Sequence, residues 1–247
     1  MRHFLTLLIL LSLSSAPLLG QTRLDFCFFA DTYNPDPVQG LWYALPDLGT
    51  YSRLNGYEGY EEIAADPRDN SNYYLTKNRF QDQFIERGTS VWSLPTLRLS
   101  GFGEGRDGYL YAGAIGAKFY RLDFSTQTYT LLATGGATFT DLAADVDGAL
   151  YGVAGNQLFQ VDTATGTQTL AVTLARPIHG IGISHDGRFW GIESINMGFS
   201  YCRNRLYQLD PVSGNTRFVM DLPNSVSSNY AGMSSETGPP QPMNSVL

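Results

Sequence analysis

Short runs of alternating apolar and polar residues recur along the chain, and most end at a turn signal. One eleven-residue pattern, two strand-like segments joined through an Asp-Gly pair, occurs at 102–112, 142–152 and 181–191. Its Asp-Gly pairs begin at Asp107, Asp147 and Asp186, which are 40 and 39 residues apart. Asp-Gly supplies the positive φ that tight hairpins need, and aromatic and β-branched residues favour strands. The pattern therefore predicts β-hairpins, and no segment has helical periodicity.

Each repeat continues with a third strand-like segment that ends in aspartate, at Asp123, Asp162 and Asp210. A polar turn and a Thr-rich fourth segment follow. We expect each of these aspartates to accept hydrogen bonds from the backbone just after it, as in an Asx turn. Four strands in about 40–45 residues is the period of a β-propeller blade.

Weaker copies flank the three clear repeats, and together they predict an all-β, single-propeller fold of five four-stranded blades. The expected blades are 26–54, 61–97, 99–130, 140–174 and 179–222. The first blade lacks an innermost strand at the N-terminus, and residues 230–234 supply a candidate. The N- and C-terminal strands would then share one blade and close the ring. The propeller is expected over 21–235, followed by a disordered tail at 236–247 that contains three prolines.

The Asp-Gly-x-Leu-Tyr motif at Asp107–Tyr111 and the Leu-Tyr-x-Leu-Asp motif at Leu206–Asp210 carry a family resemblance. They resemble exported bacterial β-propellers of the broad quinoprotein, NHL and gluconolactonase-like kind. The gluconolactonase-like members imply a divalent metal held in the central channel by Glu, Asn and Asp ligands. Glu62, Asp141 and Asn229 are the matching residues of this chain, but five blades in place of six depart from that pattern. The resemblance implies the fold and does not by itself carry an activity.

The first twenty residues have the layout of a secretory signal peptide. Arg2 and His3 precede an apolar run at 4–13, and small residues follow before Gln21. We expect residues 1–20 to be removed and the protein to be secreted or periplasmic. No later segment is long and apolar enough for a transmembrane helix, so no membrane span is expected.

The formal net charge is −7, with 16 basic and 23 acidic residues, and the arginines are scattered. Nucleic-acid and anionic-membrane binders need a clustered basic face, so neither class of partner is expected. A protein or carbohydrate ligand remains open, and we expect a monomer.

Two cysteines, Cys27 and Cys202, fall in the first and last predicted blades, which are neighbours in a closed ring. In an exported protein a pair of cysteines favours a disulfide, with two separate thiols or a catalytic cysteine as alternatives. A bridge across this loop would stabilise the fold by about 4–5 kcal/mol in the chain-entropy model.

Propeller ligands often bind where the loops entering the innermost strands converge, and the candidate residues there are Glu62, Asp141, His179 and Tyr230. Their carboxylates suit a hard cation such as calcium, whereas one imidazole does not make a zinc site. The alternative is that these side chains are hydrated and hold no ligand.

No catalytic set is recognisable in the sequence. We therefore place a non-enzymatic binding or interaction module first, with no required cofactor. The alternatives are a metal-dependent lactonase-like hydrolase that uses Glu62 and Asp141, and a carbohydrate-binding propeller whose candidate platforms are Phe199, Tyr201 and Tyr57.

Overall fold

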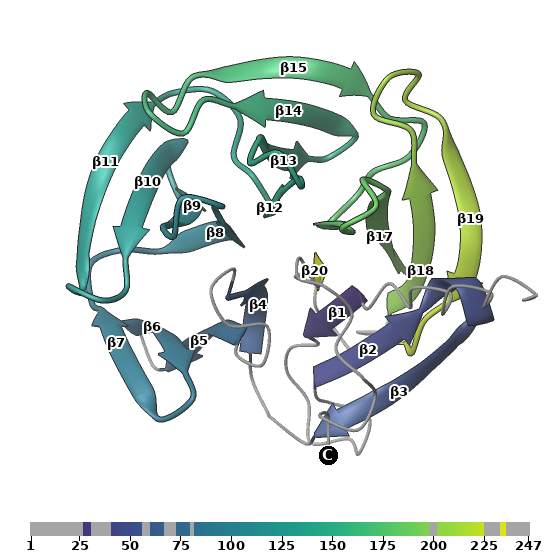
Figure 1. The fold of residues 1–247 in the computed structure, drawn as a ribbon, viewed down its shortest axis with the longest axis horizontal. Coiled ribbons are helices and arrows are strands. Elements are labelled where there is room, and N and C mark those ends of the chain that lie inside the picture. Colours follow the sequence, from purple (N-terminus) through teal and green to yellow (C-terminus); the bar gives the residue numbers. More distant parts are fainter. Residues whose placement is uncertain are drawn as a thin grey trace, which may run out of the picture.

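The computed structural model describes residues 27–30, 41–55, 60–66, 73–79, 82–197, 202–224 and 233–235. Apart from one short 3-10 turn, η1 (Pro46–Leu48), every regular element in this part is a β-strand. The strands form five four-stranded sheets arranged around a common centre (Figure 1). The prediction of an all-β propeller with four-stranded blades is confirmed.

Four blades use consecutive strands ordered from the centre to the rim. The second blade is β4 (Tyr60–Ala65), β5 (Tyr73–Arg79), β6 (Asp82–Arg87) and β7 (Ser90–Leu94). The third is β8 (Leu99–Glu104), β9 (Leu110–Ala114), β10 (Lys118–Asp123) and β11 (Thr128–Thr134). The fourth is β12 (Asp141–Ala144), β13 (Leu150–Ala154), β14 (Gln157–Val161) and β15 (Gln168–Thr173). The fifth is β16 (Gly180–Ile183), β17 (Phe189–Asn196), β18 (Cys202–Leu209) and β19 (Thr216–Asp221).

The first blade combines strands from both ends of the chain. Its order from the centre is β20 (Met233–Ser235), β1 (Cys27–Ala30), β2 (Leu41–Leu45) and β3 (Thr50–Asn55). β20 pairs antiparallel with β1 through Cys27–Ser235, Phe28–Ser234 and Phe29–Met233. The C-terminal strand therefore completes the blade that the N-terminal strands begin, as the sequence predicted.

The repeated turns have the predicted backbone chemistry. The glycines of the three Asp-Gly pairs have φ values of 84°, 88° and 80° at Gly108, Gly148 and Gly187. Asp123 Oδ1 accepts hydrogen bonds from the Ser125 and Thr126 amides at 2.9 and 3.3 Å. Asp162 and Asp210 accept the corresponding pairs of amides in the next two blades. The Asx-turn prediction is confirmed, and it explains why an aspartate ends each third strand.

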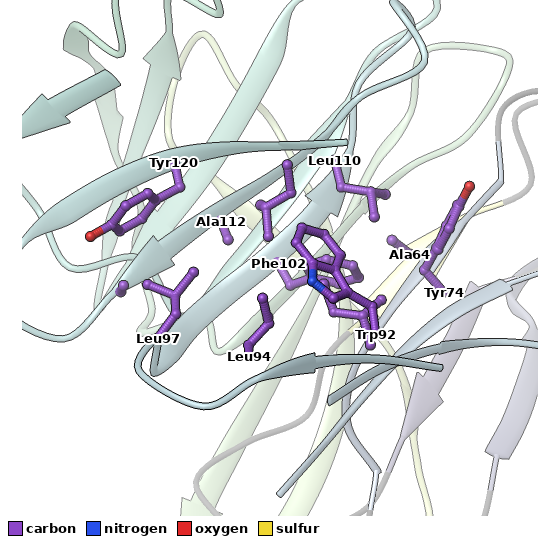
Figure 2. Close-up of a cluster of buried hydrophobic side chains, with 12 residues drawn as sticks. Ala64, Tyr74, Trp92, Leu94, Leu97, Phe102, Leu110, Ala112 and Tyr120 are labelled. Carbon is purple, nitrogen blue, oxygen red and sulfur yellow. The ribbon is translucent and has the colours of Figure 1, made fainter. Parts of the chain in front are cut away.

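Apolar side chains on the facing surfaces of adjacent blades hold the ring together. Figure 2 shows the cluster between the second and third blades, in which Trp92, Leu94 and Phe102 are buried against one another. Between the third and fourth blades the backbones approach closely at Gly103, where an added Cβ would lie 2.2 Å from the Leu142 carbonyl oxygen. Close packing between strands therefore explains the glycine at this position.

A β-bulge recurs between the third and fourth strands of four blades. The register shifts lie at Leu41/Trp42, Phe119/Tyr120, Leu158/Phe159 and Leu206/Tyr207. A bulge increases the local twist and disrupts the regular ladder near an exposed edge. The bulges therefore turn the rim strands and make the outer edges poorer templates for pairing with another chain.

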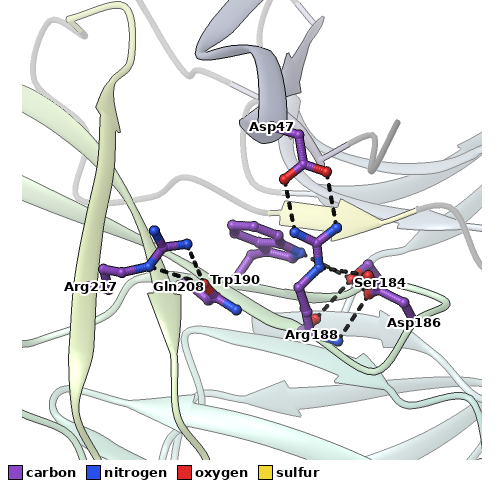
Figure 3. Close-up of polar contacts among 7 residues, drawn as sticks. All are labelled: Asp47, Ser184, Asp186, Arg188, Trp190, Gln208 and Arg217. Carbon is purple, nitrogen blue, oxygen red and sulfur yellow. Dashed lines mark hydrogen bonds and ion pairs between the residues drawn. The ribbon is translucent and has the colours of Figure 1, made fainter. Parts of the chain in front are cut away.

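An arginine joins the fifth blade to the first at the point where the ring closes (Figure 3). Arg188 Nη1 and Nη2 lie 2.9 and 3.2 Å from the two carboxylate oxygens of Asp47, and Arg188 Nε lies 2.6 Å from Asp186 Oδ2. The guanidinium also lies 5.0 Å from the centre of the Trp190 ring. Partial burial acts to raise the pKa of Asp186, but hydrogen bonds from Ser184 and Arg188 outweigh it and the pKa is lowered. Bidentate geometry and stacking make this contact more specific than a single surface ion pair.

Some of the features predicted from the sequence fall outside the described residues. These are the signal peptide at 1–20, the tail at 236–247 and the side chains of Cys27 and Tyr230. Within the described residues, no helix is long and apolar enough to cross a membrane.

The cysteines lie in neighbouring blades, and the Cys27–Cys202 disulfide stays a prediction. Cys27 pairs in register with Ala44, and Ala44 packs in one cluster with Leu206 of β18, the strand that begins at Cys202. Cys202 itself is buried. The two cysteines thus lie in adjoining blades, and Cys202 lies four residues before Leu206 along β18.

We expect the protein recovered from an oxidising compartment to take up no alkylating label under denaturing conditions until a reductant is added. Reduction then exposes two thiols per chain and lowers the free energy of unfolding by up to about 4–5 kcal/mol. Intact mass spectrometry and urea unfolding measure the two effects. A Cys27→Ser/Cys202→Ser variant is the control, because reductant should not change its stability. Two labels on the unreduced protein would show that the bridge is absent.

Candidate functional site

The innermost strands surround the channel in the order β4, β8, β12, β16 and β20, and β20 also contacts β4. We call the end at which these strands begin the channel entrance. Three of the predicted site residues lie near the starts of these strands: Glu62 is the third residue of β4, Asp141 is the first of β12, and His179 immediately precedes β16. Tyr230 lies outside the described residues.

Asp141 is fully buried and connects the fourth blade to the fifth. Its Oδ1 accepts a hydrogen bond from the Leu142 amide at 2.9 Å, and its Oδ2 accepts one from the Ile181 amide at 2.8 Å. An innermost strand has no neighbour on its channel side, so alternate amides there lack a strand partner. Asp141 satisfies two such amides from two blades. Its carboxylate therefore connects the innermost strands of these two blades.

Glu62 is also buried, with 4% of its surface exposed, but it lies in a different inter-blade space. It follows the same face of β4 as Ala64, which packs in the cluster between the second and third blades. Its register partner is Thr76, whose buried hydroxyl oxygen has no hydrogen-bond partner among the described residues. Glu62 and Asp141 are therefore not brought together, and the expectation that they converge with His179 on one cation is not supported by this geometry.

His179 is held at the entrance by two backbone contacts. Its amide donates to the Ile192 carbonyl at 2.7 Å, and its Nδ1 accepts a hydrogen bond from the Ser194 amide at 3.1 Å. Because Nδ1 is an acceptor, the neutral ring carries its proton on Nε2. Burial lowers the pKa of His179, and the negative charge of Glu193 opposes that effect only in part. Neutral imidazole is therefore the favoured form near pH 7.

A polar cluster that the sequence did not suggest lies beside His179, between the fourth and fifth blades. Glu193 is buried; its Oε2 accepts a hydrogen bond from the Tyr207 hydroxyl at 2.9 Å, and its Oε1 lies 3.4 Å from Arg176 Nη1. The Arg176 guanidinium is 5.3 Å from the Tyr207 ring centre. Burial raises the pKa of Tyr207, and its hydrogen bond to Glu193 raises it further. The hydroxyl therefore stays protonated and serves as a donor.

Ser194, the next residue along β17, begins a chain of hydrogen bonds that reaches the segment after β19. The Ser194 hydroxyl donates to Asn204 Oδ1 at 2.6 Å, and Asn204 Nδ2 donates to the Pro223 carbonyl at 2.9 Å. When the three clear repeats are aligned, Glu193 of β17 falls at the position of Ala114 in β9 and Ala154 in β13. A charged residue at a position where the other two clear repeats have alanine was the one sequence signal for this cluster.

Two other groups of polar residues have structural roles. Ser184, His185 and Asp186 do not form a relay through histidine, because the Ser184 hydroxyl donates directly to Asp186 Oδ1 at 2.6 Å and accepts from Trp190 Nε1 at 3.1 Å. Asp145 closes a hairpin by accepting the Asp147 and Ala149 amides. The proposed carbohydrate platforms Tyr57, Phe199 and Tyr201 lie outside the described residues.

The described residues contain no group of three or more His, Cys, Asp or Glu side chains arranged to hold a metal ion. The entrance offers hydrogen-bonding groups and a half-exposed cation, Arg176, but its two sequence-predicted carboxylates lie in separate inter-blade spaces.

The fold and its entrance define the class of the molecule as a β-propeller protein. No protein-family model matches the chain, and no curated protein matches it in sequence. TolB from Acinetobacter baumannii is similar in structure, with a TM-score of 0.52 and 14% identity over 86% of this chain and 66% of TolB. That likeness shows the propeller fold alone.

Two further solved structures are similar at lower scores. The hydrazine synthase of Kuenenia stuttgartiensis matches 68% of this chain and 49% of its own, with 15% identity and a TM-score of 0.47. A putative gluconolactonase matches 68% of this chain and 65% of its own, with 16% identity and a TM-score of 0.45. The chain thus spans between half and two thirds of the length of these structures.

Replacing Asp141 by asparagine should destabilise the ring. The asparagine side chain would keep one acceptor but turn its amide group toward a backbone N–H, which leaves a buried donor unpaired. We expect a loss of about 2–3 kcal/mol in the free energy of unfolding, the range for a buried hydrogen bond to a charged group. Urea unfolding measures it. Asp147→Asn, in an exposed turn of the same blade, is the control and should change stability by less than about 0.5 kcal/mol. Equal effects of the two variants would contradict the role of Asp141.

His179 should make the protein less stable in mild acid. Because burial lowers the folded-state pKa of His179, the unfolded chain binds more protons once the pH falls below the ordinary histidine value of about 6.5. Its contribution is therefore complete above that pH and is lost as the pH falls toward the folded-state pKa. We expect His179→Gln to flatten the fall in stability between pH 7.5 and 5. The exposed His185, replaced by glutamine, is the control. Identical pH profiles for wild type and His179→Gln would exclude this contribution.

Proposed function

We propose that this protein is an exported, non-enzymatic binding module that recognises its ligand at the channel entrance beside the fourth and fifth blades. The observation that carries the proposal is the bonding of Asp141. Both of its carboxylate oxygens accept backbone amides, so this predicted metal ligand already has a structural role and fewer lone pairs left for a cation. A binding role requires no activated nucleophile and no metal, and it fits the remaining polar groups.

The groups available for recognition are Arg176 and His179. The Arg176 side chain is 46% exposed, although one of its nitrogens approaches Glu193. The neutral His179 ring has a donor, Nε2, in addition to the nitrogen held by Ser194. A guanidinium and a neutral imidazole donor suit oxygen-rich ligands, such as a carboxylate-bearing protein segment or an acidic sugar.

A metal-dependent lactonase-like role is the second candidate, and Glu62 favours it. A buried carboxylate directly opposite the buried Thr76 hydroxyl offers oxygen donors of the type that hard cations bind. This site would need further ligands, because Asp141 lies in another inter-blade space and is used by the backbone.

Thermal unfolding and lactone hydrolysis with calcium, manganese or zinc at millimolar concentration separate the two candidates. We expect no metal-dependent hydrolysis and no rise in melting temperature, since a cation that binds the native state must stabilise it. Hydrolysis that requires one of these metals and is lost in Glu62→Gln would replace the binding proposal by the lactonase one.

Binding to an array of neutral and acidic glycans tests recognition directly, with the intact mature protein as the probe. A hit that weakens at least tenfold in Arg176→Ala and His179→Ala would locate the ligand at the entrance. Arg217→Ala is the matched control, because Arg217 contacts Gln208 at the rim of the same blade. Equal weakening by all three variants would place the ligand elsewhere on the propeller.

A further inference from the structure

The closing strand β20 is held in its blade differently from every other innermost strand. In the second to fifth blades, the innermost strand continues directly along the chain into the second strand of the same sheet. The second strand beside β20 is β1, which lies at the opposite end of the chain. Hydrogen bonding over three register pairs, and not a covalent connection, joins β20 to that neighbour.

β20 is also the shortest innermost strand, and its place is bounded on three sides. It has three residues, whereas β4, β8, β12 and β16 have between four and six. It contacts β16 and β4 in addition to β1 (Figure 1). Without β20, the edge of β1 would present unpaired backbone groups in a slot that accepts one extended segment, the arrangement used in strand addition.

The link that delivers β20 is longer than the geometry requires. Four or six residues join the outermost strand of one blade to the innermost strand of the next at 56–59, 95–98, 135–140 and 174–179. Eleven residues separate Asp221 from Met233 at the corresponding position. Fully extended, eleven residues reach about 36–40 Å, more than the shorter links need for the same crossing. The link therefore has more residues than the crossing to its own ring requires.

We propose that the slot beside β1 is an exchange site that takes the β20 segment either from the same chain or from a second copy of this protein. The two closures form the same strand pairs, so they differ only in which chain donates the strand. Because β20 is attached to its own ring by a short link, its effective concentration there is in the millimolar range, and the single-chain closure prevails in dilute solution. This inference concerns assembly and does not depend on the proposed ligand at the entrance.

Shortening the link tests the proposal. Deletion of residues 224–232 leaves Leu222 and Pro223 between β19 and β20, a reach of about 11 Å. Crossing one four-stranded blade takes three strand spacings, about 14 Å, so β20 can no longer return to its own ring. We expect this variant to form a dimer with twice the monomer mass by size exclusion with light scattering. The matched control deletes 225–229, keeps six residues as in two other links, and should remain monomeric.

A cleaved form of the full chain provides a second measurement in case the deletion variant does not fold. A protease site is inserted after Asn224, the chain is cut, and a fluorescent synthetic peptide of residues 225–247 is added. We expect saturable binding as the labelled peptide replaces the cut segment, seen as a rise in anisotropy. A peptide with Met233→Pro and Ser234→Pro should bind at least tenfold more weakly, because adjacent prolines remove an amide on either side of the strand. A folded, monomeric deletion variant, or a cut ring that takes up neither peptide, would overturn the proposal.

Discussion

The packing of each blade against two neighbours is the constraint on which the rest of this molecule depends. Among the described residues, buried apolar clusters join the second blade to the third, the third to the fourth and the fourth to the fifth. The cluster that contains Trp92 and Phe102 joins the second and third blades, and the cluster that contains Ala44 and Trp190 joins the first and fifth. Closure is therefore part of the core, because an open ring would expose two apolar faces to water.

Closing the ring creates a second problem at the centre, where the innermost strands have unpaired edges. Asp141 is one solution, since a single carboxylate binds an amide of its own strand and an amide of the next blade. A carboxylate used in this way has one lone pair of each oxygen directed at a backbone donor, which fixes its orientation and leaves fewer lone pairs for a ligand. The presence of Asp141 near the entrance therefore has a structural explanation that requires no metal site.

The repeats could be read from the sequence because their signals are local. Asp107–Gly108 and Asp123 fix the backbone within a few residues, so their turns could be predicted from short segments alone. The role of Asp141 could not, because it depends on the amide of Ile181, forty residues away in another blade. Glu193 was missed for a related reason: its partners Arg176 and Tyr207 lie in a link and in a neighbouring strand. At a sheet edge, the direction in which a side chain points depends on residues that are close in space but far apart in the sequence.

The two ends of the channel also differ in how strictly the chain repeats. At the end opposite the entrance, the connections from first to second strand contain five residues at 105–109, 145–149 and 184–188, and seven at 66–72. The links at the entrance range from four to eleven residues, and that end also carries the polar cluster around Glu193. The connections at the entrance thus vary more in length, and connections that vary are the ones in which binding residues are most often found. The variation in the links thus points to the same end of the channel as Arg176 and His179, independently of the chemistry of those two residues.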